Sequence, residues 1–243
     1  MGYIFPKSAN RLPLMLAGGL PLLLVVVFTG GWYYLTPDFF EVGYAPEQPV
    51  QYQHNKHVTQ LGIDCRYCHS QVEESPHANI PSTSTCIACH DGNVGTDQAM
   101  LNTTLWAAHK TNQSLIKVRQ SYETGEPIRW RRIHMVPHYA HFNHSVHVNA
   151  GVSCYSCHGR MDQMDHPAYQ VESLGMGWCL DCHRNPEEAL VDVDGLLGDP
   201  TSVTDLASVA EQLNTAGHAR EIGMKLVEEK QLQPPQYCAA CHY

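Results

Sequence analysis

The stretch that decides the fold reads Phe142-Asn-His144-Ser-Val-His147-Val-Asn-Ala-Gly-Val-Ser-Cys154-Tyr-Ser-Cys157-His158. It joins a pair of histidines three residues apart to a Cys-x-x-Cys-His motif. That motif is the attachment sequence of c-type haem. Each thiol adds to one vinyl group of the porphyrin, and the adjacent histidine becomes the proximal ligand of the iron. The stretch therefore predicts a covalently bound haem.

Five such motifs occur in the 243 residues, and they use all ten cysteines. The attachment residues are Cys65, Cys68, Cys86, Cys89, Cys154, Cys157, Cys179, Cys182, Cys238 and Cys241, and the adjacent proximal ligands are His69, His90, His158, His183 and His242. Structural zinc sites and redox dithiols also use Cys-x-x-Cys. With 16 histidines in the chain, chance would place one after every motif only about once in a million. We predict five low-spin haem c groups and a function in electron transfer.

The histidine pair also occurs twice. The first clamp, residues 52–58, reads Tyr-Gln-His-Asn-Lys-His-Val before the first motif, and the second clamp, residues 142–148, reads Phe-Asn-His-Ser-Val-His-Val before the third. Two imidazoles one helical turn apart cannot bind one iron from the same side. Each pair is therefore expected to fill the open axial positions of two haems as neutral rings. The predicted distal ligands are His54, His57, His144 and His147.

A fifth distal ligand is needed. His134 lies just before Met135-Val-Pro137, in the segment that leads into the second clamp, and we expect it to supply this ligand. Met164 is the alternative, which would leave one haem with His/Met ligation and a raised potential. His138 and His141 continue the three-residue spacing of the second clamp and stay open as ligands.

The N-terminal segment from Leu12 to Leu35 has no charged residue. At about 1.5 Å per residue its length suffices to cross a bilayer core. Lys7 and Arg11 precede it, so the positive-inside rule places the N-terminus in the cytoplasm and the haem domain on the periplasmic side of the inner membrane. A cleaved signal peptide would be shorter and would end at an Ala-x-Ala-like site, which does not follow Phe28. We predict an uncleaved single-pass anchor.

Composition fixes the remaining expectations. A formal net charge of -9 excludes nucleic acid as a partner, and only five Phe and four Trp indicate that the haems supply much of the core. The predicted fold class is mainly α and irregular, a haem-wrapped multihaem cytochrome of class III type with one N-terminal transmembrane helix.

Apolar periodicity predicts helices over 98–120 and 203–231. The expected organisation is a cytoplasmic N-terminus (1–11), the anchor (12–35), a first dihaem module with a helical insert (36–133), a second dihaem module (134–202), and a C-terminal helix with the fifth haem (203–243).

The clamps followed by paired motifs resemble the multihaem cytochromes of the c7 and c3 type. The whole chain is similar to the pentahaem, membrane-anchored cytochrome subunits of alternative complex III. The residues that carry this likeness are Trp130-Arg-Arg-Ile-His134, its continuation through the second clamp to Cys154, and Met176-Gly-Trp-Cys179-Leu-Asp-Cys182-His183-Arg184. In that family a histidine stands where His134 does here, whereas other residue types are expected at His138 and His141.

The resemblance implies a subunit that is not catalytic alone and works within a quinol:electron acceptor oxidoreductase complex. Its partners would be integral-membrane quinol-oxidising subunits, an iron–sulfur subunit, and a mono-haem cytochrome c or terminal oxidase as acceptor. The main alternative is a single-helix-anchored multihaem quinol dehydrogenase that acts without an iron–sulfur partner. A catalytic multihaem enzyme needs an iron with an open site, and the histidine in all five motifs argues against it.

Overall fold

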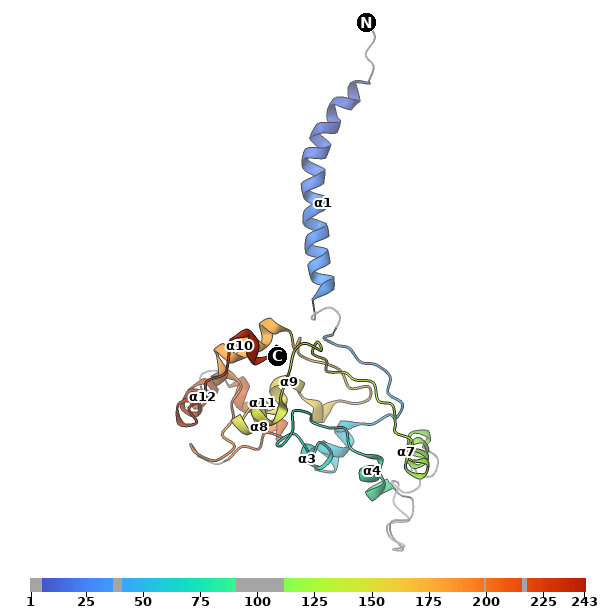
Figure 1. Ribbon diagram of the computed structural model, residues 1–243, viewed down its shortest axis with the longest axis vertical. Helices are drawn as coiled ribbons and strands as arrows, with labels where there is room; N and C mark the ends of the chain where they lie inside the picture. The colour runs from blue at the N-terminus through green and yellow to red at the C-terminus, as the bar shows by residue number, and fades with distance from the viewer. Residues whose placement is uncertain (1–5, 37–40, 91–111, 199, 216–217) are drawn as a thin grey trace.

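The computed structural model describes residues 6–36, 41–90, 112–198, 200–215 and 218–243. Over these ranges the chain forms helices joined by irregular loops, without a strand, and contains one isolated antiparallel bridge between Val152 and Leu190. This helical architecture with one apolar N-terminal helix is compatible with the predicted fold class. Figure 1 shows that helix standing away from the globular part.

The N-terminal helix α1 spans Leu12–Leu35 and follows a 3-10 turn, η1, over Lys7–Arg11. Its bounds coincide with the uncharged segment. No residue of α1 is buried within the chain, and its most apolar part has a mean hydropathy of 2.3. A helix that is apolar all round and packs against nothing in its own chain needs an apolar environment from elsewhere. Its length and composition suit a membrane anchor.

Each attachment motif forms a short helix or turn. These elements are α3 over Cys65–Cys68, α4 over Thr83–His90, α9 over Cys154–His158, α10 over Met176–Arg184 and η5 over Cys238–Ala240. Asp64 caps α3 by accepting a hydrogen bond from the Arg66 N–H, and Ser153 caps α9 in the same way through Tyr155. Such caps satisfy N–H groups that the first turn of a helix leaves free.

The two clamps also form helices. The first carries η2, a π-helix over Asn55–Gln60 with His54 at its N-cap, and the second carries α8, an α-helix over His144–Ala150. Two 3-10 turns, η3 over Met161–Gln163 and η4 over Pro186–Glu188, follow the third and fourth motifs.

The expected helix over 98–120 is wrong in its bounds. Residues 98–111 lie outside the described ranges, and helix α7 spans Gln113–Thr124. The Asn112 side chain accepts a hydrogen bond from the Ser114 N–H at 2.8 Å and starts the helix, which ends at Gly125 with a φ of 74°. An Asn cap starts a helix and a left-handed glycine ends one, and apolar periodicity detects neither signal.

The single helix expected over 203–231 is also wrong, because two helices form there. Helix α11 spans Leu206–Asn214 and α12 spans His218–Glu229. Val209 of α11 joins Val191 and Val203 in the buried core, whereas α12 brings Gly223 against the backbone of Glu187 in η4. The interruption allows the two helices to pack on different parts of the chain.

Figure 1 shows how the elements are distributed. Helices α3, α4 and α7 lie at the end of the globular part away from α1, while α10 and the C-terminus lie at the end nearer to α1. Helices α8, α9 and α11 lie between them. The motif-bearing elements therefore extend from one end of the globular part to the other.

Candidate haem sites

The first clamp orients its two histidines around one aromatic ring. Tyr52 stacks on His57 with ring centroids 4.4 Å apart and an interplanar angle of 23°, and it meets His54 edge-on at 4.8 Å. The His57 ring faces His90, the proximal histidine of the second motif, at 6.1 Å between ring centroids. A metal bound at about 2 Å by a nitrogen of each ring would separate the ring centres by about 6 Å. These two rings therefore fit the two axial positions of one iron.

The second clamp repeats this geometry. Phe142 stacks on His147 at 4.5 Å with an angle of 29° and meets His144 edge-on at 4.8 Å. The His147 ring faces His183 of the fourth motif at 6.0 Å. The second histidine of each clamp thus lies opposite the proximal histidine of the second motif in its own module.

Hydrogen bonds fix the tautomer of six of the predicted ligands. In each, Nδ1 lies within 2.9 Å of a backbone carbonyl oxygen: His57 with Gln53, His69 with Asn79, His144 with Pro76, His147 with Asn143, His183 with Pro235 and His242 with Tyr139. A carbonyl can only accept, so Nδ1 carries the proton and Nε2 keeps its lone pair. This is the arrangement in which proteins hold a metal-binding imidazole.

His134, the expected fifth distal ligand, lies beside the third motif. Its Nε2 is 3.1 Å from Nδ1 of His158, and the two rings are 4.2 Å apart. Burial lowers the pKa of His134 to about 4 and that of His158 to about 3, so both rings are neutral at physiological pH. The structure brings His134 to a proximal histidine, but too close for a metal to stand between these rings.

His54 and His144 lie near His69 of the first motif. Burial lowers the pKa of both, that of His54 to about 4, and His69 is the first charged neighbour that lowers each further. Nδ1 of His54 is buried without a hydrogen-bond partner. Together with His134, the structure therefore offers three distal histidines around two proximal ones, those of the first and third motifs.

The fifth motif contacts a segment that sequence reasoning left open. The N–H of His141 donates to the carbonyl of Cys241 at 2.8 Å, and the His141 ring stacks on Tyr243 with centroids 4.2 Å apart. Tyr139 supplies the carbonyl that holds His242. The signal in the sequence was the three-residue spacing that runs from His138 through His141 to the second clamp.

Met164 is buried, and its carbonyl accepts a hydrogen bond from the Asn55 N–H of the first clamp at 3.2 Å. It lines a hollow of about 420 Å³ together with Tyr155 and Gly159 of the third motif region. The structure thus places the alternative ligand near the third motif.

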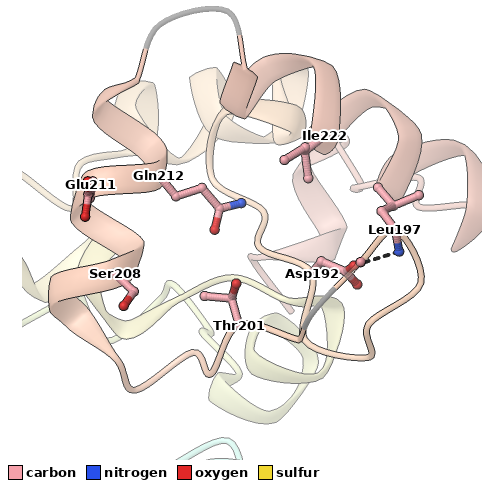
Figure 2. A pocket seen from close by; sticks show the side chains of 8 residues that line it. Asp192, Leu197, Thr201, Ser208, Glu211, Gln212 and Ile222 are labelled. Carbon is pink, nitrogen blue, oxygen red and sulfur yellow. Dashed lines mark hydrogen bonds between the residues drawn. The ribbon is translucent and has the colours of Figure 1, made fainter.

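A second hollow, of about 390 Å³, lies between α11 and α12 (Figure 2). Its lining contains neither cysteine nor histidine among the described residues. The Asp192 carboxylate that borders it accepts hydrogen bonds from the backbone N–H groups of Leu196 and Leu197 at 2.9 and 2.7 Å. This carboxylate organises a loop.

The cysteines of all five motifs fit covalent haem, whereas the contact between His134 and His158 leaves no room for a metal between those two rings. All ten cysteines are unpaired. Every motif ends in a proximal histidine. In His69, His183 and His242, Nδ1 contacts a backbone carbonyl and Nε2 is left for a metal. In His158, Nδ1 contacts Nε2 of His134 instead. These residue types are the ones that hold covalent haem with histidine ligation in proteins.

Comparison with known proteins supports a multihaem c-type cytochrome, and with it covalent c-type haem. Over 182 residues the chain is 26% identical to the multiheme cytochrome c subunit of menaquinone reductase from Nitratidesulfovibrio vulgaris. The aligned region covers 67% of this chain and 78% of that protein. No protein-family model matches the sequence.

Proposed function

We propose that this chain is an electron-transfer subunit that carries five covalently bound, low-spin haem c groups, mostly with bis-histidine ligation. The observation that carries this is the pair of imidazole couples, His57 with His90 and His147 with His183, at ring separations of 6.1 and 6.0 Å. Bound haem would supply reversible one-electron chemistry there. The protein orients the axial rings, keeps them neutral and holds their Nδ1 protons.

We infer a place at the outer face of the inner membrane. Helix α1 would anchor the chain in a single pass, with Lys7 and Arg11 on the cytoplasmic side and the haem domain in the periplasm. The similar protein is a subunit of a menaquinone reductase, which supports a role linked to the quinone pool.

The finer proposal is a subunit of alternative complex III. Electrons would come from integral-membrane quinol-oxidising subunits through an iron–sulfur subunit and leave to a mono-haem cytochrome c or a terminal oxidase. What supports this is the sequence resemblance across the anchor, the second clamp and the fourth motif.

The test compares the purified chain with the chain in its native membrane. Reduced menaquinol analogue is added to each, and haem reduction is followed in the α-band. We expect rapid reduction in membranes and none of comparable rate in the purified chain, with dithionite as the control that all haems are reducible. Rapid reduction of the purified chain would instead support a self-sufficient quinol dehydrogenase.

A further inference from the structure

We propose that the five attachment motifs lie in the spatial order second, first, third, fourth, fifth, so that the two modules meet through the first motif of each. In residue numbers the order is Cys86, Cys65, Cys154, Cys179, Cys238. This rests on haem attachment at every motif, as proposed above. It differs from the order along the chain, in which the second motif would stand between the first and the third.

The centre of this order is the contact between the first and third motifs. Their helices start side by side, because Thr204 Oγ1 donates to the Asp64 cap of α3 at 2.6 Å and the Ser153 cap of α9 donates to the Val203 carbonyl at 2.6 Å. The dipeptide Val203-Thr204 thus hydrogen bonds to the N-cap residues of both helices.

Each clamp also contacts the loop that follows the first motif of the other module. The Asn55 N–H of the first clamp donates to the Met164 carbonyl at 3.2 Å, and Thr59 Oγ1, directly after the clamp in η2, donates to the Asp162 carbonyl at 2.7 Å. Both acceptors lie just after His158 of the third motif. The first clamp is therefore shared between the modules.

The second clamp makes the reciprocal contacts. The backbone N–H groups of His144 and Ser145 donate to the carbonyls of Pro76 and Ser75, both at 3.2 Å. The side chain of Asn149, directly after the clamp in α8, donates to the Glu73 carbonyl at 3.0 Å. These acceptors follow the first motif. Each module therefore contacts the loop after the first motif of the other module.

The outer motifs attach to opposite sides of this centre. In the first module, His57 of the clamp that leads into the first motif faces His90 of the second motif at 6.1 Å between ring centroids. In the second module, His147 of the clamp that leads into the third motif faces His183 of the fourth motif at 6.0 Å between ring centroids. The second motif is thus a neighbour of the first, and the fourth a neighbour of the third.

The fifth motif extends the order beyond the fourth. His183 of the fourth motif bonds through Nδ1 to the Pro235 carbonyl at 2.7 Å, and the Gln236 side chain donates to the His183 carbonyl at 3.4 Å. Figure 1 agrees, since α4, α3, α9 and α10 with the C-terminus succeed one another from the end away from α1 to the end nearer to it.

The order is tested by electron injection at the fifth motif. A photoreductant is tethered at Tyr243→Cys, an exposed position next to His242, and haem reduction is followed after a flash. Two matched double variants are compared. Cys86→Ala with Cys89→Ala removes the second-motif haem, and Cys65→Ala with Cys68→Ala removes the first-motif haem. Mass spectrometry must show four covalent haems in each.

We expect every remaining haem to be reduced in the fast phase when the second-motif haem is absent, because it lies at the far end. When the first-motif haem is absent, the second-motif haem should no longer be reduced in the fast phase. The amplitude of the fast phase should then be smaller by one haem than the number of haems that remain. The reverse result would overturn the order. Fewer than five covalent haems in the parent chain would instead count against the proposed function.

If a double variant does not fold, His69→Met and His90→Met give the same comparison with both thioethers kept. A methionine ligand raises the haem potential and turns that haem into an electron trap. With one electron injected per chain, we expect His90→Met to show transient reduction of the first-motif haem before the second-motif haem, and His69→Met to show no transient reduction of the second-motif haem. Transient reduction of the second-motif haem before the first in His69→Met would contradict the proposed order.

Discussion

The two clamps reach the same geometry by different backbone paths. Seven residues separate His57 from Cys65, whereas six separate His147 from Cys154. The first clamp absorbs the additional residue as a π-helix, η2, in which the Leu61 N–H donates to the Lys56 carbonyl at 3.1 Å. π-Helical turns are rare and often occur at functional sites. The position of the rings is thus retained while the helix type changes.

The clamps differ in local support. In the second clamp, the Asn143 side chain caps α8, and Pro76 accepts the Nδ1 proton of His144. In the first clamp, the N-cap His54 makes no side-chain cap bond, and its Nδ1 is buried without a partner. The second clamp is therefore the more rigidly held, and changes to its supporting residues should have the larger effects.

The largest effect is expected from His57→Met and His147→Met. Each change replaces one axial imidazole by a thioether and should raise one midpoint potential by part of the ~0.8 V range that axial ligands span. Because both histidines face a proximal ring at about the same separation, the two shifts should be similar. A spectroelectrochemical titration measures them, with His77→Met at an exposed position as control. A shift in only one variant would break the equivalence of the clamps.

The glycines that follow the clamps should respond unequally to alanine. Both have positive φ, 67° at Gly62 and 99° at Gly151, which costs an alanine about 1–2 kcal/mol. A Cβ on Gly151 would also lie 2.8 Å from the Val191 carbonyl oxygen, whereas one on Gly62 meets no atom within 4 Å. We expect Gly151→Ala to lose a further ~1–3 kcal/mol. Denaturant unfolding of the holoprotein would show this, and equal losses would contradict the difference.

A smaller effect is expected at the helix caps. The Asn143 side chain accepts from the Ser145 N–H at 3.0 Å, so Asn143→Ala should reduce the free energy of unfolding by about 1 kcal/mol. Gln53 occupies the matching position in the first clamp, but only its backbone carbonyl makes a hydrogen bond to the described residues, with His57. Gln53→Ala should therefore be close to neutral in the same unfolding measurement. A loss at Gln53 equal to that at Asn143 would show that the first clamp has a cap of its own.

The smallest effect is expected for the pH dependence of stability, at the caps of the motif helices α3 and α9. Burial alone would raise the pKa of Asp64, but hydrogen bonds from Arg66 and Thr204 outweigh it and hold the pKa at about 2. A depressed pKa contributes stability that is present above the unfolded value near 4 and is lost as the pH falls toward 2. Ser153, the matching cap of α9, does not titrate. We expect Asp64→Asn to flatten the acid slope of stability between about pH 4 and 2, whereas an unchanged slope would exclude this carboxylate.

Sequence reasoning succeeded where the determinants are local. The run from Leu12 to Leu35 predicted the bounds of α1, since its apolar character needs no partner within the chain. The Cys-x-x-Cys-His spacing and the repeated clamps singled out the four histidines that form the two facing ring pairs, and their ligation of iron stays a prediction. The π-helix of the first clamp was not predictable, because one additional residue can also be accommodated in a loop.

The remaining features depend on contacts between distant residues. The meeting of the first and third motifs rests on Thr204 and Asp64, 140 positions apart, and no spacing rule encodes it. The break between α11 and α12 follows from packing of Val209 in the core and of Gly223 on η4. The contact of His141 with the fifth motif also depends on the tertiary fold. In the sequence, only the regular histidine spacing indicated a role for this residue.

The central claim is that all five motifs, in both modules and in the C-terminal tail, carry haem. Intact-mass spectrometry of the protein isolated from membranes, under denaturing conditions, tests it most directly. The account predicts one species with five covalently attached haems and no free thiol that reacts with an alkylating reagent. A chain that carries fewer haems, with alkylated cysteines or bound zinc at the remaining motifs, would contradict it.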